Sequence, residues 1–453
     1  MKLPAPAPDL ATLTRKYMET LGTILDARIG PEVNGAYEHW DKVRHRAPPA
    51  GLNAEQWWLG ITWTRAALLK PLPLLLDKTQ QPFKLALTDS MQRHLHYIDR
   101  EAAGSVKGVD AASGQGRFLI RSLIEEAMTS SQLEGASTTR AVAKEMLSTG
   151  RAPRDQSERM IYNNYVAMNV IRERGIRPIT PGEILELHSI LTDGTLELPT
   201  DSGRFRTAED NVAIFDRGSP PTLLHIPPPA EEVPARIERL CTFINEESAP
   251  FIHPVAKAIA LHFQIGYDHP FVDGNGRTAR ALFYWAMMNA GYWMTEYFSI
   301  SSVLKKSPGK YMRAYLYTES DNRDLGYFVA QQLEAIEQSI QGLHAYIARK
   351  HAEDQAARRV LRTARLGGVP LNHRQRALLA NALKDPDRTY TVASHQAAHT
   401  ITYPTALKDL NGLVASGLVS KERVGKASEY LVLPGLSGTF GAVDLRHAGM
   451  TGR

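Results

Sequence analysis

The sequence is short of several features, and each shortage excludes a class of protein. It contains a single cysteine, Cys241, so no disulfide can form within the chain and cysteines cannot build a zinc site. The most apolar run, LLKPLPLLL, is interrupted by Lys70, Pro71 and Pro73 and is too short to span a membrane. The first residues, MKLPAPAPDLATL, lack the apolar stretch of a secretion signal. We therefore expect a cytoplasmic protein without membrane contact.

Repeats and low-complexity tracts are also lacking, and the charge is nearly balanced. The net charge of +5 is compatible with a nucleotide or nucleic acid partner, but equally with an ordinary solvated surface. The hydrophobic fraction of 43% and the charged fraction of 22% are those of a globular protein. A chain of 453 residues is too long for one hydrophobic core, so we expect two or three domains.

Hydrophobic periodicity predicts a mainly α protein. Helical patterns dominate, and the aromatic stretch WWLGITW is interpreted as a buried helix face rather than a ligand site. The β-prone runs NVAIF and TLLHI, joined by DRGSPP, predict a β-hairpin among the later helices. Near the C-terminus, three helical patterns and two strands around Gly425 resemble a winged helix-turn-helix. The predicted regions are a helical N-terminal region (1–115), a helical core (116–345), a linker helix (346–369), the winged helix (370–435) and a loose tail (436–453).

The stretch HPFVDGNGRTAR, residues 269–280, holds a histidine, a carboxylate, two glycines and two arginines within twelve positions. Pro270 disfavours helical geometry at His269, so the preceding helix is predicted to end just before this residue. Apolar residues at helical spacing in TARALFYWAMMNAG then place Gly274 to Gly276 at a helix N-terminus. Such an end offers unpaired N–H groups and the positive pole of the helix dipole, which bind phosphate.

The charged residues of this stretch also suit a phosphate site. Arg277 and Arg280 are three residues apart, share a helix face and can each fork onto phosphate oxygens. Asp273 is a suitable ligand for Mg²⁺, which binds one or two carboxylates together with substrate phosphates. His269 is then a base that faces the phosphate. A plain turn with a capping histidine is the alternative, whereas neither a P-loop nor a Rossmann fingerprint matches these residues.

Residues 269–280 meet every defining position of the Fic family signature, H-P-F-x-[D/E]-G-N-G-R-x-x-R, and the sequence resembles this family over about residues 116–345. The resemblance implies an all-helical core, a hairpin flap that positions the target, and SGRFR as the segment leading into that flap. It implies transfer of AMP from ATP to a Ser, Thr or Tyr hydroxyl of a protein, including the enzyme itself. His269 would deprotonate the hydroxyl and Asp273 would hold Mg²⁺. The implied ATP-binding residues are Gly274, Asn275, Gly276, Arg277, Thr278, Ala279 and Arg280, with Tyr311 as a weaker candidate for the nucleoside.

The upstream stretch SSQLEGAS resembles the inhibitory motif of the same family, [S/T]-x-x-x-E-[G/N]. Ser130, Glu134 and Gly135 stand at its defining positions, and its place before the core fits the class with an N-terminal inhibitory helix. A carboxylate at position 134 can pair with Arg280 and occupy the guanidinium that would otherwise bind the γ-phosphate. We therefore expect autoinhibition by Glu134. The sequence leaves open whether it acts within one chain or across a homodimer.

Two further alternatives stay open. Gly276 stands where relatives that transfer phosphate carry lysine, which favours nucleotidyl transfer, yet phosphocholine transfer or removal of AMP fits the same motif. A different alternative is a DNA-binding regulator that uses the core as a nucleotide sensor. His253 and His262 lack the spacing of a zinc site and are interpreted as helix-start and packing residues. The candidate DNA contacts are Tyr403, Thr405 and Lys408 in the third helix of the winged region, and Lys421, Arg423 and Lys426 in its wing.

Overall fold

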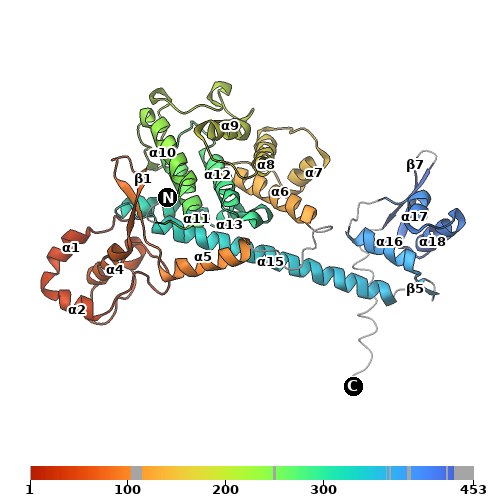
Figure 1. The fold of residues 1–453 in the computed structure, drawn as a ribbon, viewed down its shortest axis with the longest axis horizontal. Coiled ribbons are helices and arrows are strands. Elements are labelled where there is room, and N and C mark those ends of the chain that lie inside the picture. Colours follow the sequence, from red (N-terminus) through yellow and green to blue (C-terminus); the bar gives the residue numbers. More distant parts are fainter. Residues whose placement is uncertain are drawn as a thin grey trace, which may run out of the picture. The chain divides into compact units, whose positions relative to one another are not determined.

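The computed structural model describes residues 2–103, 115–247, 251–363, 365–366, 369–384, 389–424 and 427–432. The chain forms two compact units, Met1–Leu343 (unit 1) and His344–Arg453 (unit 2). As the periodicity predicted, the described part is mostly helical, and its strands pair as four two-stranded antiparallel sheets (Figure 1). Across these described residues, every helix is too short or too polar to cross a lipid bilayer.

The N-terminal region is helical, with one hairpin that the sequence analysis missed. Asn53 and Gln56 cap the start of α4 (Ala54–Leu68) reciprocally, and Trp58 is fully buried, as expected for WWLGITW. The next run, KPLPLLL, forms strand β1 (Lys70–Leu76) paired with β2 (Pro82–Leu85). Its two prolines explain the change, because proline breaks a helix but is tolerated in an edge strand. The other helices here are α1 (Leu10–Lys16), α2 (Leu21–Asp26), α3 (Trp40–Val43) and α5 (Asp89–Ala102).

Two adjacent helices form the centre of unit 1 and are joined by the loop of the HPFVDGNGRTAR motif. Helix α11 (Pro254–Asp268) packs against α12 (Asn275–Asn289), and the two lie side by side in Figure 1. Almost every residue of α11 is buried, as expected of a helix that is apolar on most of its faces. The helices packed around this pair are α6 (Gln115–Leu133), α8 (Gln156–Arg174), α9 (Pro181–Thr192) and α10 (Val233–Asn245).

The break between α11 and α12 falls where the sequence predicted it. Helix α11 ends at Asp268, and His269 adopts a left-handed conformation with φ +46°. Gly274, with φ +82°, precedes the first residue of α12, so the glycines and the asparagine of the motif do lie at a helix N-terminus. The remaining helices of this unit are α7 (Arg140–Thr149), α13 (Ile300–Leu304), α14 (Pro308–Ser320) and the first part of α15 (Gly326–Thr363).

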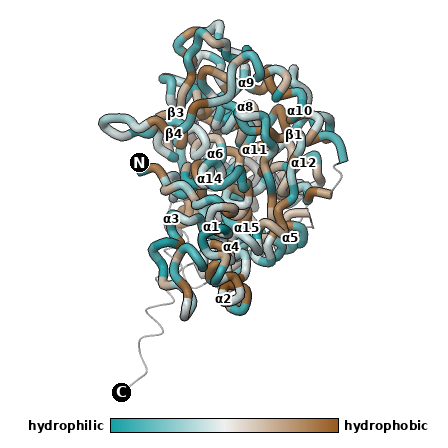
Figure 2. The backbone as a smooth tube through the Cα atoms, turned by 90° about the vertical axis from the view of Figure 1, so that its left-hand side faces the viewer, coloured by the Kyte–Doolittle hydropathy of each residue, from teal (hydrophilic) through white to brown (hydrophobic). Residues whose placement is uncertain are grey.

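The predicted hairpin is present but shorter than the β-prone runs. Strands β3 (Ile214–Phe215) and β4 (Leu223–His225) pair antiparallel, and Figure 2 shows them together at one edge of unit 1. The Asp216 carboxylate accepts hydrogen bonds from the N–H groups of Gly218 and Thr222, which closes the turn of DRGSPP.

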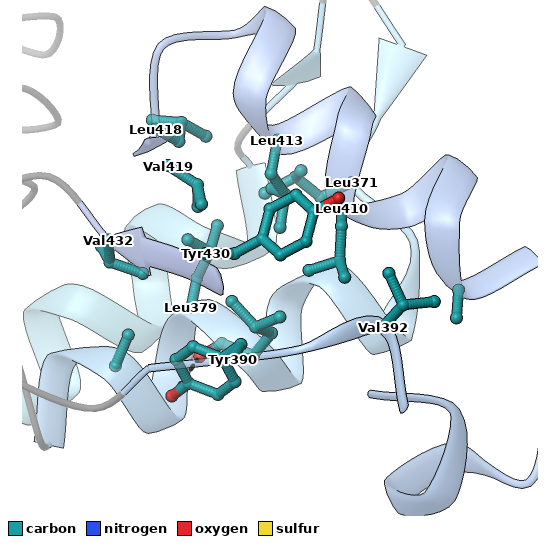
Figure 3. Packing of buried hydrophobic residues seen from close by; sticks show 13 residues of the cluster. Leu371, Leu379, Tyr390, Val392, Leu410, Leu413, Leu418, Val419, Tyr430 and Val432 are labelled. Atoms are coloured by element: carbon teal, nitrogen blue, oxygen red, sulfur yellow. Dashed lines mark hydrogen bonds between the residues drawn. The ribbon is translucent and has the colours of Figure 1, made fainter. Parts of the chain in front are cut away.

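Unit 2 has the three helices and the later strand pair that the sequence predicted, but the end of the predicted linker helix forms a short strand pair, β5–β6, instead. Tyr430 lies near the centre of its hydrophobic cluster, among Leu379, Leu410 and Leu413 (Figure 3). Helix α15 continues without a break past the predicted limit at residue 345, and Gly425, Lys426 and the tail 436–453 lie outside the described residues. The elements are β5 (Arg365–Leu366), β6 (Val369–Pro370), α16 (His373–Lys384), α17 (Val392–His399), α18 (Tyr403–Ala415), β7 (Val419–Val424) and β8 (Ala427–Val432).

Candidate active site

His269 is held as a neutral base. Its Nδ1 lies 3.2 Å from the carbonyl oxygen of Gly266, which can only accept, so Nδ1 carries the hydrogen and Nε2 is the proton acceptor. Burial lowers the pKa of His269 to about 4, so the ring is uncharged at neutral pH. The left-handed backbone is strained for a residue with a side chain, and such strain is concentrated at functional sites.

Arg206 fastens the segment before the hairpin to the loop that carries His269. Its Nε donates to the carbonyl of His269 at 2.8 Å, and its Nη2 donates to the carbonyls of Asp268 and Pro228. Its own backbone N–H donates to the carbonyl of Pro270. Arg206 is the last residue of SGRFR, and the family resemblance of that segment predicts no role for this residue in particular.

Gly274 and Asn275 shape the turn that begins α12. A Cβ at position 274 would lie 2.7 Å from Cγ2 of Thr192, so both this contact and the positive φ require glycine. The Asn275 side chain turns inward, where it accepts from the N–H of Phe271 at 2.9 Å and donates to its carbonyl at 2.8 Å. Asn275 can therefore contribute its backbone N–H to a bound anion, while its amide braces the loop.

Arg277 is buried with part of its guanidinium unused. Its side chain is 1% exposed, and Nη1 donates to the carbonyl of Leu191 at 2.8 Å. Its Nη2 lies 3.5 Å from the Asp273 carboxylate, and Nε has no hydrogen-bond partner. Burial lowers the pKa of Arg277. A buried donor without a partner is costly, which is expected where a ligand completes the site.

Arg280 is paired with Ser130 and Glu134, two of the three predicted residues of the upstream motif. Its Nε donates to Oγ of Ser130 at 2.8 Å, and its Nη2 donates to Oε1 of Glu134 at 2.7 Å. Burial by itself lowers the pKa of Arg280 and raises that of Glu134, but the pairing outweighs burial, so the pKa of Arg280 is raised and that of Glu134 is lowered. Both groups are therefore charged at neutral pH.

The Glu134 carboxylate lies directly against the first turn of α12. Glu134 follows the last residue of α6, and a Cβ at position 276 would come within 2.2 Å of its Oε1. Glycine at position 276 thus leaves room for this carboxylate. The neighbouring Gly135 has φ +111°, a conformation that suits glycine at the end of a helix.

The other predicted positions lie deeper. Thr278 and Ala279 are fully buried and face the interior of unit 1. The hydroxyl of Tyr311 lies 2.7 Å from Nε2 of His262, which places Tyr311 in the buried aromatic packing. His262 is fully buried, and His253 caps the start of α11 by accepting the N–H of Val255, in agreement with the interpretation of both as structural.

Asp273 fits the requirements of a Mg²⁺ ligand. Its side chain is 61% exposed, so its oxygens are accessible next to the N-terminus of α12. Within the described ranges, no three His, Cys, Asp or Glu side chains gather into a group that could hold a metal by themselves. One carboxylate beside a phosphate site matches the way Mg²⁺ is bound, because the substrate and water supply its other ligands.

His188 is a second buried residue, besides Arg206, that contacts the motif without having been predicted. His188 of α9 lies 2.9 Å, through Nε2, from the carbonyl oxygen of Asp273, and its Nδ1 accepts the N–H of Gly203 at 3.0 Å. The available signal was a histidine on the apolar face of the helix, beside Ile184 and Leu191. That signal is weak, because buried histidines commonly serve packing alone.

Comparisons with known proteins agree with this geometry. Residues 178–287 match the model of the Fic/DOC family. A stretch of 206 residues is 29% identical to "Protein adenylyltransferase Fic" of Drosophila willistoni and covers 44% of this chain and 39% of that protein. The protein of the same name in Drosophila melanogaster is 32% identical over 165 residues, which cover 35% of this chain and 31% of that protein. The chain thus spans about a third of the length of these relatives.

A solved structure shares the fold. A glutamate-to-glycine variant of Fic-1 from C. elegans superposes with a TM-score of 0.50 at 17% identity, over 76% of this chain and 90% of that one. The predicted resemblance is confirmed for residues 178–287, which match the model of the Fic/DOC family and contain the HPFVDGNGRTAR motif.

Proposed function

We propose that this protein is an adenylyltransferase that transfers AMP from ATP to a Ser, Thr or Tyr hydroxyl of a protein. One observation carries the proposal: a neutral histidine, a helix N-terminus, two buried arginines and an exposed carboxylate converge on one loop. This set matches what in-line attack on a phosphate requires. The relatives named protein adenylyltransferase Fic support the same reaction.

The geometry of the loop supports the following reaction. The hydroxyl oxygen attacks the α-phosphorus of ATP while Nε2 of His269 takes its proton, and the bond to the oxygen that bridges to the β-phosphate breaks, releasing pyrophosphate. The N–H groups at the start of α12, with Arg277 and Arg280, stabilise the negative charge that develops on the phosphate oxygens. Mg²⁺, held by Asp273, would add positive charge beside those oxygens. ATP as the donor favours the cytoplasm as the place of action.

The β3–β4 hairpin is the proposed docking edge for the target protein. Phe215, Leu223 and Ile226 are large apolar side chains with more than two-fifths of their surface exposed. Each strand of a two-stranded sheet has a free edge, which can pair with an extended segment of another protein. Main-chain pairing of this kind would place a hydroxyl near His269 without demanding a particular sequence.

Glu134 is the proposed brake. Its carboxylate takes the Nη2 donor of Arg280 and puts negative charge at the first turn of α12, where phosphate oxygens need positive charge. The contact is made within a single chain, which supports inhibition without a second copy. Because Glu134 lies on a turn and its side chain is 30% exposed, it can leave Arg280 without unfolding the core.

Intact-mass spectrometry tests the function. Wild type, Glu134→Gly and Glu134→Gly/His269→Ala are each incubated with ATP and Mg²⁺, and the added mass of AMP groups is measured. We expect AMP to accumulate strongly in the single variant, weakly in wild type and not in the double variant. Phosphocholine donors and a pre-AMPylated sample, run in parallel, examine phosphocholine transfer and AMP removal.

The contrary results are distinct. AMP addition that survives loss of His269 would rule out this histidine as the base, and equal addition in wild type and Glu134→Gly would rule out the brake. If AMP is added neither to the chain nor to any protein of a proteome lysate, the proposed transferase activity is ruled out, whereas the description of the fold still holds.

Unit 2 supports a second candidate function, DNA binding. Tyr403 of α18 is 56% exposed, Lys408 is also exposed, and Lys421 and Arg423 project from β7. On this surface α18 could lie in the major groove of DNA while the β7–β8 strand pair contacts the phosphates. DNA affinity, measured by electrophoretic mobility shift, should fall steeply as the salt concentration rises. In the variant Lys421→Ala/Arg423→Ala this dependence on salt should be weaker than in wild type, and both results together would support DNA binding. A DNA affinity that changes neither with salt concentration nor with substitution of Lys421 and Arg423 would contradict DNA binding through this surface.

A further inference from the structure

His188 bonds two separate segments beside the proposed active site. It belongs to α9, outside residues 269–280, and its side chain is fully buried. The N–H of Gly203 can only donate, so Nδ1 of His188 is the acceptor and Nε2 carries the hydrogen. That hydrogen is donated to the carbonyl of Asp273. One neutral tautomer therefore satisfies both bonds, and the other tautomer would satisfy neither.

The ring of His188 also forms the floor of the turn that begins α12. It stacks on Phe271 with the ring centroids 3.7 Å apart and the planes 4° from parallel. Thr192, one helical turn later, and the His188 ring together leave no room for a side chain at Gly274, where a Cβ would lie 3.3 Å from Nε2. The floor and the inward hydrogen bond fix the peptide between Asp273 and Gly274.

This arrangement sets the direction of the Asp273 side chain. The carbonyl of Asp273 is drawn inward to His188, while its carboxylate stays exposed beside the N-terminus of α12. Gly203, on the other side of the ring, belongs to SGRFR, which Arg206 fastens to the loop of His269. His188 thus connects the Asp273 turn to the segment that leads into the hairpin.

We propose that His188 is a positioning residue that aims the Asp273 carboxylate at the cation bound with ATP. The proposal rests on the proposed function, because it assumes that Asp273 binds a divalent cation together with nucleotide. Groups that orient a metal ligand commonly change metal affinity by about 10- to 100-fold when they are removed. A histidine that served packing alone would affect stability and leave metal affinity unchanged.

Two substitutions separate these roles. In His188→Gln the amide reaches the place of Nε2 and can still donate to the Asp273 carbonyl. In His188→Asn the shorter amide reaches the place of Nδ1, so it can accept from Gly203 but cannot reach Asp273. Both variants lose the stacking on Phe271, so they serve as matched controls for packing.

The measurement is binding of Mn²⁺, used as a spectroscopic probe for Mg²⁺, by electron paramagnetic resonance in the presence of ATP and in the Glu134→Gly background. We expect His188→Asn to weaken Mn²⁺ binding by about tenfold or more, and His188→Gln to remain within about threefold of the parent. Equal binding by the two variants would overturn the positioning role alone. Failure of the parent to bind Mn²⁺ with ATP would overturn the proposed function, and the role of His188 with it.

A second measurement needs no substitution. Nuclear magnetic resonance of the full chain with isotope-labelled histidine reports which ring nitrogen carries the hydrogen. We expect His188 as the neutral tautomer with hydrogen on Nε2 at neutral pH. Hydrogen on Nδ1 would break both bonds described above and would overturn the proposal even if the variants fail to fold.

Discussion

The two units bury an arginine–carboxylate pair in opposite ways. In unit 2 the carboxylate is the buried partner: Asp409 accepts from Arg374 at 2.6 Å and from Asn372 at 2.7 Å, and His395 lies 3.3 Å away. These contacts join α16, α17 and α18, so the pair holds the unit together. In the Arg280–Glu134 pair of unit 1 the arginine is the buried partner.

Arg280 is 1% exposed, whereas Glu134 lies on a turn with its side chain 30% exposed. A carboxylate at the surface can be exchanged for a phosphate, but one enclosed by three helices cannot. An ion pair therefore indicates function when its buried member is the one that a ligand needs, and structure when its buried member is fully satisfied by protein groups.

Removing the arginine of each pair gives the largest expected contrast. Arg280→Ala, in the Glu134→Gly background, should slow AMP transfer by about 10²- to 10³-fold, because it removes a preorganised positive charge from the phosphate site. Arg374→Ala should leave the rate unchanged but destabilise unit 2 by about 1.5–3 kcal/mol, because Asp409 loses charge-assisted hydrogen bonds. Initial rates of AMP transfer and urea unfolding measure the two effects.

The unfolding experiment can distinguish the units within the full chain. All 6 tryptophans of the sequence lie before residue 344, so tryptophan fluorescence reports unit 1 alone, whereas circular dichroism reports both units. Arg280→Lys, which keeps the charge but lacks the planar fork, controls for loss of folding and should show an intermediate rate. A reduced rate of AMP transfer in Arg374→Ala, or an unchanged rate in Arg280→Ala, would contradict the assignment of a structural role to the first pair and a functional role to the second.

Lowering the pH should separate the units by the type of group that titrates. In unit 1, burial lowers the pKa of His269 and of His188 to about 4, from 6.5. As the pH falls from 6.5 to about 4, these two histidines become protonated in the unfolded chain but stay neutral in the folded unit. The free energy of unfolding of unit 1 therefore falls in this pH range. The same pKa of His269 places the acidic limb of kcat/KM near pH 4.

Unit 2 should respond mainly at lower pH. Burial raises the pKa of Asp409, but the hydrogen bonds from Arg374 and its neighbours outweigh burial and lower it below 3.8, so its contribution is present above 3.8 and is lost as the pH falls through the folded value. Burial lowers the pKa of His399 in unit 2 as well, so some stability is also lost there as the pH falls below 6.5. Acid titrations followed by fluorescence and by circular dichroism should therefore not coincide. Coincident curves, or an acidic limb of activity near 6.5, would contradict these assignments.

Local sequence patterns predicted much of the fold and of the candidate site. The helix break at His269 followed from Pro270, and the hairpin followed from the Gly and Pro residues between two β-prone runs. The strand at KPLPLLL was not predicted, because its apolar residues do not alternate with polar ones and its two prolines are unusual in a strand. These features depend on residues that are neighbours in sequence.

The contacts that complete the site join residues far apart in the chain and therefore leave no local pattern. His188 meets Asp273, and Arg206 meets the carbonyls around His269, only because α9 and the segment before the hairpin pack against the α11–α12 pair. The pairing of Glu134 with Arg280 was anticipated from the family resemblance rather than from spacing. The inward turn of the Asn275 amide had no signal in the sequence, since the same residue suits an anion site or a loop brace.

The smallest expected effect concerns the contact between the hairpin and the end of α6. Nη2 of Arg217, in the hairpin turn, donates to the carbonyl of Leu133, the residue before Glu134. Arg217→Ala should loosen this end and weaken the brake by about 0.5–1 kcal/mol, which raises the basal rate of AMP transfer about two- to fivefold. Arg15→Ala, which removes an exposed arginine that donates to a backbone carbonyl of α1, is the matched control and should change nothing.

The combination with Glu134→Gly shows whether Arg217 acts through the brake. Without the Glu134 carboxylate, the contact of Arg217 with Leu133 no longer affects the inhibition. Arg217→Ala should therefore have no further effect on the rate in that background. A rise of the same size in both backgrounds would mean that Arg217 influences the hairpin or the target directly. The exposed hydrogen bond at Leu133 would then be a surface contact, and the only restraint on Arg280 that matters for the rate would be Glu134 itself.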